Sequence, residues 1–200
     1  VQDGSKTVYY QGQKKGLFKY TSIPNAHDNI RDITIDDNGN VYVAAGEIFK
    51  WSYKKKKFEK FISNNHYKKI SSGLPGSLWA INEDRDIYEY FNGKMNKRNK
   101  VGGRIEGQDI DVSVSGVVYA TTRSHETLLN IPEGYGVYMA EGHEGHHIKC
   151  ELFKYNPVKK IFEQVWNKGT NYAQLVAVAV DGSPWTSRAS CQNNHVYKPK

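Results

Sequence analysis

Hydrophobic and polar, or large and small, side chains alternate along short segments of this chain, with the period of two that β-strands require. The alternation is clear in Ile33-Thr34-Ile35 and in Val176-Ala177-Val178-Ala179-Val180. The first segment is followed by Asn38-Gly39, a strong hairpin signal because both residue types readily reach positive φ. No stretch with helical periodicity interrupts the pattern. It therefore predicts short antiparallel strands joined by tight turns.

The hairpin signal recurs along the chain. Each copy has mostly β-branched residues six and four positions before a turn glycine, and an aromatic residue three positions after it. The glycines are Gly39, Gly76, Gly116 and Gly182, and the aromatic residues are Tyr42, Trp79, Tyr119 and Trp185. The first two intervals are 37 and 40 residues, and the third, of 66 residues, returns to about 40 once an insertion of about 26 residues is removed. A period in this range indicates a repeated supersecondary unit.

A second strand unit follows each glycine unit, as in Ile48-Phe49-Lys50-Trp51 and Leu152-Phe153-Lys154-Tyr155. Each repeat can therefore be divided into four strands, A to D, which in the second repeat cover about 31–36, 41–45, 47–53 and 58–61. The third repeat covers about 67–100, the fourth about 104–168, and the fifth opens near Ala173. We predict an all-β fold in one domain, residues 1–200. It is a β-propeller of about five visible four-stranded blades, which could belong to a six-bladed ring.

The two ends of the repeat array are incomplete. Val1-Gln2-Asp3-Gly4 resembles Val180-Asp181-Gly182, the end of a strand A and its turn. Most of strand A of the first blade and strand D of the last blade are therefore missing from the pattern. Propellers usually close by sharing one blade between the two chain ends. Two alternatives stay open: a loose closure within this chain, or a further blade outside it.

The repeats resemble the tectonin family of β-propellers, which is related to the fish-egg lectins. The segment from Ile70 to Asn82, followed by Ile87-Tyr88, is most similar to the family pattern, and Val176 to Trp185 is the next. The resemblance covers most of the chain but is degenerate, since Tyr42 and Tyr119 replace the usual tryptophan. The tryptophan that often opens a tectonin repeat is present only as Trp166. The resemblance implies carbohydrate binding or a scaffolding role, without catalysis.

Aromatic side chains are the candidate sugar-stacking platforms. The candidate ligand-binding residues are Trp51, Trp79, Tyr155, Trp166 and Trp185. The alternative for the aromatic residues after each turn glycine is packing between adjacent blades, which their common register favours. Trp51 and Tyr155 alternate differently along their strands and could reach a surface.

Basic residues recur where strands C and D should be joined. The formal net charge is +7 and the sequence pI is about 9.2. We expect a basic rim on the face that also carries the A–B turns, and an anionic partner: an acidic glycan, an acidic protein surface or a lipid headgroup. The alternative is a set of solvated, solubilising turn tips, and nucleic acid is unlikely because no nucleic-acid motif accompanies the charge. The rim residues are Lys54, Lys55, Lys56, Lys57, Lys97, Arg98, Lys159 and Lys160.

An insertion in the fourth blade, residues 122–148, should project from the opposite face, because it joins strands B and C. It holds His143, His146 and His147, and Cys150 follows it. These residue types could bind zinc or copper, but the paired-cysteine or His-Glu-x-x-His spacing of a strong zinc motif is missing. We therefore predict a polar, glycine-rich recognition loop with no metal and no cofactor. A disulfide between Cys150 and Cys191 stays open.

The motifs of enzymes are missing from the sequence: no nucleophile elbow, P-loop or dinucleotide fingerprint is present. A metal-dependent lactonase is disfavoured because no set of inward carboxylates is evident in the A strands. The sequence therefore predicts a non-enzymatic, lectin-like binding propeller with repeated shallow sites. The alternative is a structural subunit that packs or self-assembles into a larger complex. No apolar run is long enough to span a membrane, and an extracellular or cell-surface location is favoured over a cytoplasmic one.

Overall fold

The computed structural model describes residues 7–11, 18–22, 30–122, 124–127, 146–149, 151–165, 173–190 and 193–197. Every regular element within these ranges is a β-strand, which confirms the predicted all-β fold. Strands β1 (Thr7–Gln11) and β2 (Phe18–Ser22) form an antiparallel pair with residues 9 and 20 in register. These two strands belong to the first repeat.

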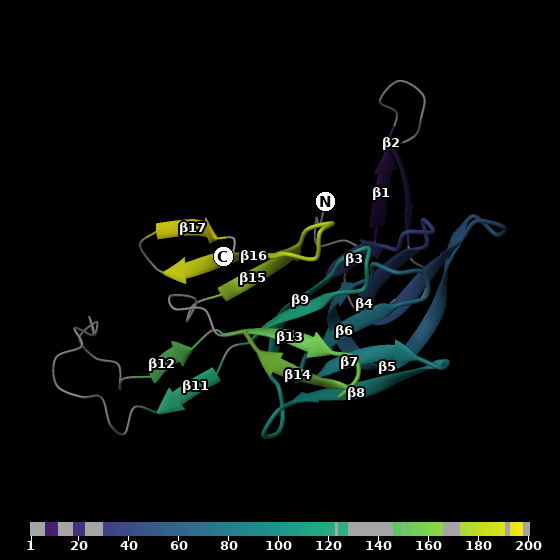
Figure 1. Cartoon of the computed structure of the whole chain (residues 1–200). Coiled ribbons are helices and arrows are strands. Elements are labelled where there is room, and N and C mark those ends of the chain that lie inside the picture. The colour runs from purple at the N-terminus through teal and green to yellow at the C-terminus, as the bar shows by residue number, and fades with distance from the viewer. Residues whose placement is uncertain are drawn as a thin grey trace, which may run out of the picture.

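A ten-stranded sheet holds the second, third and fourth repeats (Figure 1). It begins with β3 (Asp32–Ile35), β4 (Val41–Ser52) and β5 (Lys57–Ser71). It continues with β6 (Leu78–Asn82), β7 (Ile87–Phe91) and β8 (Lys94–Lys100). The remaining strands follow in the spatial order β14 (Ile161–Gln164), β13 (Leu152–Asn156), β10 (Val118–Thr122) and β9 (Gly107–Val112).

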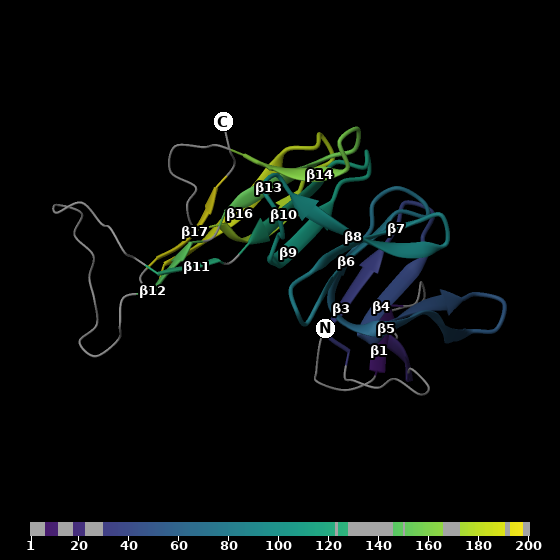
Figure 2. The same ribbon diagram turned by 90° about the horizontal axis from the view of Figure 1, so that it is seen from below.

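The third and fourth blades each have the expected order of four antiparallel strands. In the third blade these are the end of β5, then β6, β7 and β8, and in the fourth they are β9, β10, β13 and β14. The two blades join through their outer strands, since β8 and β14 pair in parallel at Asn99 and Ile161. Figure 2 shows β8 lying between the strands of the two blades. The fifth repeat forms a separate three-stranded sheet of β15 (Ala173–Val178), β16 (Pro184–Ser190) and β17 (Asn193–Tyr197).

The second blade departs from the prediction. Its expected strands B and C are one strand, β4, which has a positive φ of 74° at Gly46 and a register shift between Gly46 and Ile48. Its expected strand D and the following strand A are likewise one strand, β5, with a φ of 48° at His66. A bulge in a continuous strand bends the chain while its neighbours keep pairing. Two local bends therefore replace the two predicted connections.

The four repeated glycines occupy equivalent turns, as predicted. Their φ angles are 74°, 77°, 82° and 79° at Gly39, Gly76, Gly116 and Gly182. In the second blade the Tyr53 hydroxyl, from the C–D turn, donates a hydrogen bond of 2.6 Å to the Gly39 carbonyl of the A–B turn. The A–B and C–D turns of this blade therefore lie on one face of the molecule, which we call the turn face.

The core lies between the blades. After three of the four turn glycines, the aromatic residue packs with an aliphatic residue in strand A of the next blade: Tyr42 with Ile70, Trp79 with Ile110, and Tyr119 with Val176. The three aromatic side chains are 2%, 2% and 6% exposed. The packing interpretation is thus confirmed for these three positions.

Candidate ligand-binding site

The face opposite the turn face carries the B–C turns and the D–A connections. The B–C turn of the third blade closes through a hydrogen bond of 3.1 Å from the Asn82 amide to the Asp86 carbonyl. The side chain of Asn82 accepts a second bond, of 2.8 Å, from the Asp86 amide. Arg85 adopts a positive φ of 64°, which allows this short turn. The turn presents Glu83, Asp84 and Arg85 at the surface.

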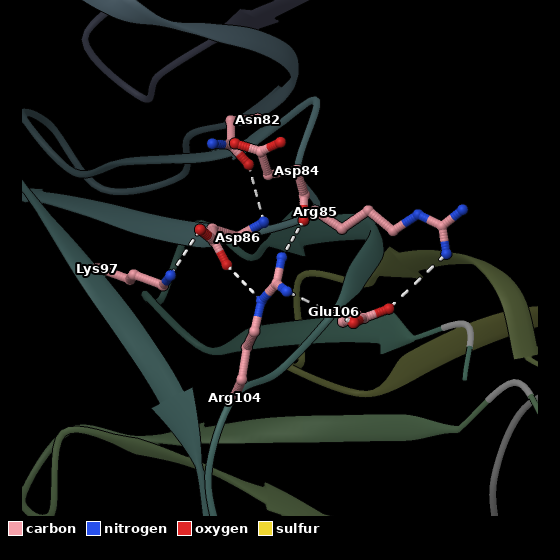
Figure 3. A network of polar contacts seen from close by, with 7 residues as sticks. All are labelled: Asn82, Asp84, Arg85, Asp86, Lys97, Arg104 and Glu106. Carbon is pink, nitrogen blue, oxygen red and sulfur yellow. Dashed lines mark hydrogen bonds and ion pairs between the residues drawn. The ribbon is translucent and has the colours of Figure 1, made fainter. Parts of the chain in front are cut away.

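Asp86 is the centre of the charged cluster in Figure 3. One carboxylate oxygen lies 2.6 Å from Lys97 Nζ of β8, and the other lies 2.8 Å from Arg104 Nε of the next D–A connection. Arg104 also donates to the Asp84 carbonyl. Burial alone would raise the pKa of Asp86, but the hydrogen bonds from Lys97 and Arg104 outweigh it and lower this pKa. The carboxylate is therefore ionised and holds two cations in fixed places.

The outer part of the cluster is exposed. The Glu106 carboxylate lies 3.7 Å from Arg104 and 3.9 Å from Arg85 (Figure 3). A further pair, 2.8 Å apart, joins Arg31 at the start of strand A of the second blade to Glu83. Arginine donors and glutamate acceptors thus alternate across the connections of the second, third and fourth blades.

Lys68 stands beside these pairs and adds an unbalanced positive charge. Its ammonium group forms no hydrogen bond or ion pair within the part of the chain that the structure describes. Burial lowers the pKa of Lys68, and the charges of Arg85 and Arg31 lower it further, while Glu83 opposes them. An anion bound here would relieve this repulsion.

The inner strands hold carboxylates that we did not expect from the sequence. Asp32 accepts a hydrogen bond of 2.9 Å from the Ile70 amide of the next blade. Asp109 and Asp111 accept bonds of 3.0 Å and 2.6 Å from Val176 and Val178 in the same way. The expectation from the sequence that the A strands lack a set of inward carboxylates, which disfavoured a metal-dependent lactonase, was therefore wrong. In this structure they serve as acceptors that join one blade to the next.

Backbone amides and a nearby lysine partly offset the negative charges of these inner-strand acids. Burial raises the pKa of Asp32 and of Asp109, against the hydrogen bonds that both receive from backbone amides. Lys69 lies between them, with its ammonium 3.7 Å from Asp109. Within the described ranges, no three histidine, cysteine or acidic residues form a group that could hold a metal ion.

A second repeated feature was missed although its signal is in the sequence. An acidic residue stands at the start of strand C or directly before it in three blades, and in each case strand D supplies a donor for it. The pairs are Lys60–Glu47 at 2.8 Å, Lys97–Asp86 at 2.6 Å and Gln164–Glu151 at 2.7 Å. The same acid–donor pairing in three blades would have predicted that Lys97 lies in strand D, where it pairs with Asp86, and not in the C–D turn.

The aromatic candidates differ widely in exposure. Trp79 and Tyr155 pack edge to face in the core, with ring centroids 4.6 Å apart, so neither offers a surface for stacking. Trp51 is half-buried, 5.1 Å from the Phe58 ring. Trp185 is 41% exposed and remains a candidate platform. Trp166 lies outside the described residues.

The basic candidates divide into two groups. Lys54 to Lys56 and Lys159 to Lys160 lie in exposed C–D turns, and Lys57 begins β5. The predicted turn position of Lys97 and Arg98 was wrong, because both lie inside β8 and the turn is Asn92-Gly93, with φ angles of 52° and 79°. Arg98 pairs across the strands with Glu89, at 2.8 Å from Nε. The prediction that the basic rim binds an anionic partner stays a prediction.

The insertion leaves the sheet on the same face as the charged cluster. Its closing hydrogen bond, of 2.9 Å from the Thr122 amide to the Glu151 carbonyl, matches the bond that closes the Asn82–Asp86 turn. Its arms pair as β11 (Ser124–Thr127) and β12 (His146–Lys149), which extend away from the blades in Figures 1 and 2. Instead of a plain loop, these arms form a hairpin. His143, Cys150 and Cys191 lie outside the described residues, as do the side chains of His146 and His147.

Comparisons with known proteins support a β-propeller repeat. A family model described as a β-propeller repeat (SBBP) matches residues 18–45. No curated protein matches the chain significantly. Virginiamycin B lyase from Staphylococcus aureus is 12% identical, with a TM-score of 0.63, over 98% of this chain and 63% of the lyase chain. The chain thus spans less than two thirds of that protein.

Two further solved structures show the same fold. A chain of a nidogen–laminin complex has a TM-score of 0.61 and 11% identity, over 99% of this chain and 72% of that one. The WD40 repeats of RRP9 have a TM-score of 0.63 and 8% identity, over 99% of this chain and 62% of that one. These likenesses show a β-propeller fold. Within the described ranges, no helix is long and apolar enough to cross a membrane.

Proposed function

We propose that this protein is a non-enzymatic binding module that recognises an acidic carbohydrate at the charged cluster. The observation that carries the proposal is Lys68, a half-buried ammonium group beside Arg85 and Arg31 that lacks a carboxylate partner among the described residues. A ligand carboxylate or sulfate at this point would make a charge-assisted hydrogen bond with it. The resemblance to tectonin lectins supports the same ligand class.

The paired groups around Lys68 suit a polyhydroxyl ligand. A sugar hydroxyl both donates and accepts hydrogen bonds, so it binds best where both kinds of group are exposed. Arg85, Glu106 and Arg104 form such a row, and Arg31 with Glu83 forms a second one. Because Asp86 already holds Arg104 in place, part of the ordering entropy is lost before the ligand arrives.

A non-enzymatic role agrees with the use of the inner-strand acids. Asp32, Asp109 and Asp111 bind backbone amides of the following blade, so their oxygens are engaged in holding the fold. The propeller fold alone does not decide the matter, because a lyase shares it.

A glycan array followed by calorimetry tests the proposal. We expect binding of uronic-acid or sulfated glycans over neutral ones, with a loss of about tenfold or more in Lys68→Gln and in Arg85→Gln. Lys94→Gln, an exposed lysine of the C–D hairpin in the same blade, is the matched control and should bind as the wild type does. Equal affinity in Lys68→Gln would show that the site lies elsewhere, and no binding of any glycan would reject the lectin role.

A second candidate function, a scaffold subunit, is favoured by the β11–β12 hairpin. It belongs to one blade and extends beyond the sheet, as an assembly arm would (Figure 1). Polymerisation measured by light scattering, in the absence of glycan binding, would support this role instead.

A further inference from the structure

Among the described residues, six of the eleven exposed large apolar side chains lie in or beside the turns of the turn face. Leu74, Val114 and Val180 lie in three successive A–B turns and are 42%, 44% and 78% exposed. Tyr53, Phe91 and Val158 lie in or beside three C–D turns and are 63%, 50% and 90% exposed. On the opposite face, the third-blade turn and the connection after it carry mainly charged residues, and Val101 is the exposed large apolar side chain among them. The two faces therefore differ in chemical character.

These turns form one connected surface in the third to fifth blades. A β-carbon placed on Gly116 would lie 2.5 Å from Leu74 Cδ1, so the A–B turns of the third and fourth blades touch. One on Gly182 would lie 3.3 Å from Val117, which brings the fifth blade against the fourth. Lys160 Nζ lies 5.8 Å from the centre of the Phe91 ring, which joins the C–D turns of the third and fourth blades.

Lysines surround the apolar tips. Lys55 and Lys159 are paired with Glu59 and Glu163, at 2.6 Å and 2.7 Å. The others have no carboxylate within ion-pair distance among the described residues: Lys54, Lys56, Lys57, Lys94 and Lys160. Exposed acids on this face are fewer, with Asp37 and Asp181 in the A–B turns. The turn face is therefore both apolar at its tips and positively charged.

We propose that the turn face docks on an anionic lipid membrane. Single apolar side chains at the tips of separate turns can enter the boundary between headgroups and acyl chains, while neighbouring lysines bind anionic headgroups. A deformable lipid surface can accept all the tips at once. A protein partner would need a matching hollow for each of them, so the arrangement favours a membrane. This site is separate from the glycan site, which lies on the opposite face.

Sedimentation with vesicles of phosphatidylcholine, with and without phosphatidylglycerol, tests the proposal on the whole chain. We expect binding only to the anionic vesicles, and weaker binding as salt rises from about 0.1 M to about 1 M, where the Debye length falls from about 10 Å to about 3 Å. Lys54→Gln combined with Lys56→Gln should lower affinity by about fivefold for each lysine. Wild-type protein that stays in the supernatant with both kinds of vesicle would overturn the proposal.

A second experiment tests the apolar tips by comparing two exposed valines, Val158 on the turn face and Val101 away from it. Val158→Asp should weaken vesicle binding, whereas Val101→Asp, at a valine 63% exposed in the D–A connection, should not. Val158→Trp should show a blue shift of its fluorescence on adding anionic vesicles, and Val101→Trp should show none. Equal effects at the two valines would overturn the insertion of the tips.

Binding of the wild type to a polyglutamate peptide, but not to vesicles, would identify an acidic protein as the partner and reject the membrane.

Discussion

At the scale of single residues, Asp86 is the group on which the charged cluster depends. It is ionised, buried and bonded to Lys97 and Arg104. We expect Asp86→Asn to lower the free energy of unfolding by about 1.5–3 kcal/mol at neutral pH, the typical value for hydrogen bonds to a charged group. Glu106→Gln, which breaks only exposed pairs, should cost less than about 1 kcal/mol.

The pH dependence of this effect has a definite sign. Because the pKa of Asp86 in the folded state is below its ordinary value of 3.8, its contribution is present above that value and is lost as pH falls through the lowered pKa. The difference between wild type and Asp86→Asn, measured by urea unfolding, should therefore shrink in acid. A difference that stays constant from neutral to acidic pH would show that the loss comes from packing instead.

Two tryptophans at the same repeat position give a second residue-scale prediction. Trp79 is 2% exposed and packs against Tyr155 and Phe162, whereas Trp185 is 41% exposed. Trp79→Ala should cost about 3–5 kcal/mol of stability, as large-to-small changes in cores do. Trp185→Ala should cost less than half as much, by chemical denaturation. Similar losses at both positions would mean that Trp185 is covered in solution.

At the scale of elements, the β11–β12 hairpin should be separable from its blade. The Thr122–Glu151 bond matches the Asn82–Asp86 bond, so the short turn of the third blade should fit in its place. We predict that replacing residues 123–150 by Glu-Asp-Arg keeps the melting temperature, since β10 and β13 still pair at Thr121 and Leu152. If the hairpin is a recognition arm, partner capture or polymerisation will be lost. An unfolded variant would instead assign the insertion to the core.

At the scale of the whole molecule, the two faces should act independently. Lys68→Gln should weaken glycan binding without changing vesicle binding, and Val158→Asp should do the reverse. The reason is geometric, because B–C turns and A–B turns lie at opposite ends of the same strands, and strand length keeps them apart. Calorimetry with glycan in the presence and absence of anionic vesicles measures the coupling. A change in glycan affinity of more than about fivefold would contradict independence.

The sequence by itself determined most of the strands, their repeat and the four A–B turns. Alternation around Ile33 and Val176, and glycines at the four turns, are local features, because a period of two and a positive φ depend on a few neighbouring residues. The Asn92-Gly93 turn was equally readable, and overlooking it misplaced Lys97 and Arg98. An acid before strand C was a further local signal for the Lys97–Asp86 pair.

Only the tertiary structure decided which side chains are available to a ligand. Trp79 and Trp185 occupy the same repeat position, yet one is buried by the following blade and the other is not. Asp32 and Asp109 could have formed a catalytic or metal-binding set, but the amides of Ile70 and Val176 occupy them. These outcomes depend on contacts between residues about 40 to 70 positions apart, and a repeat pattern does not specify what the next blade brings to each position. Burial and pairing are therefore set by how the blades pack together.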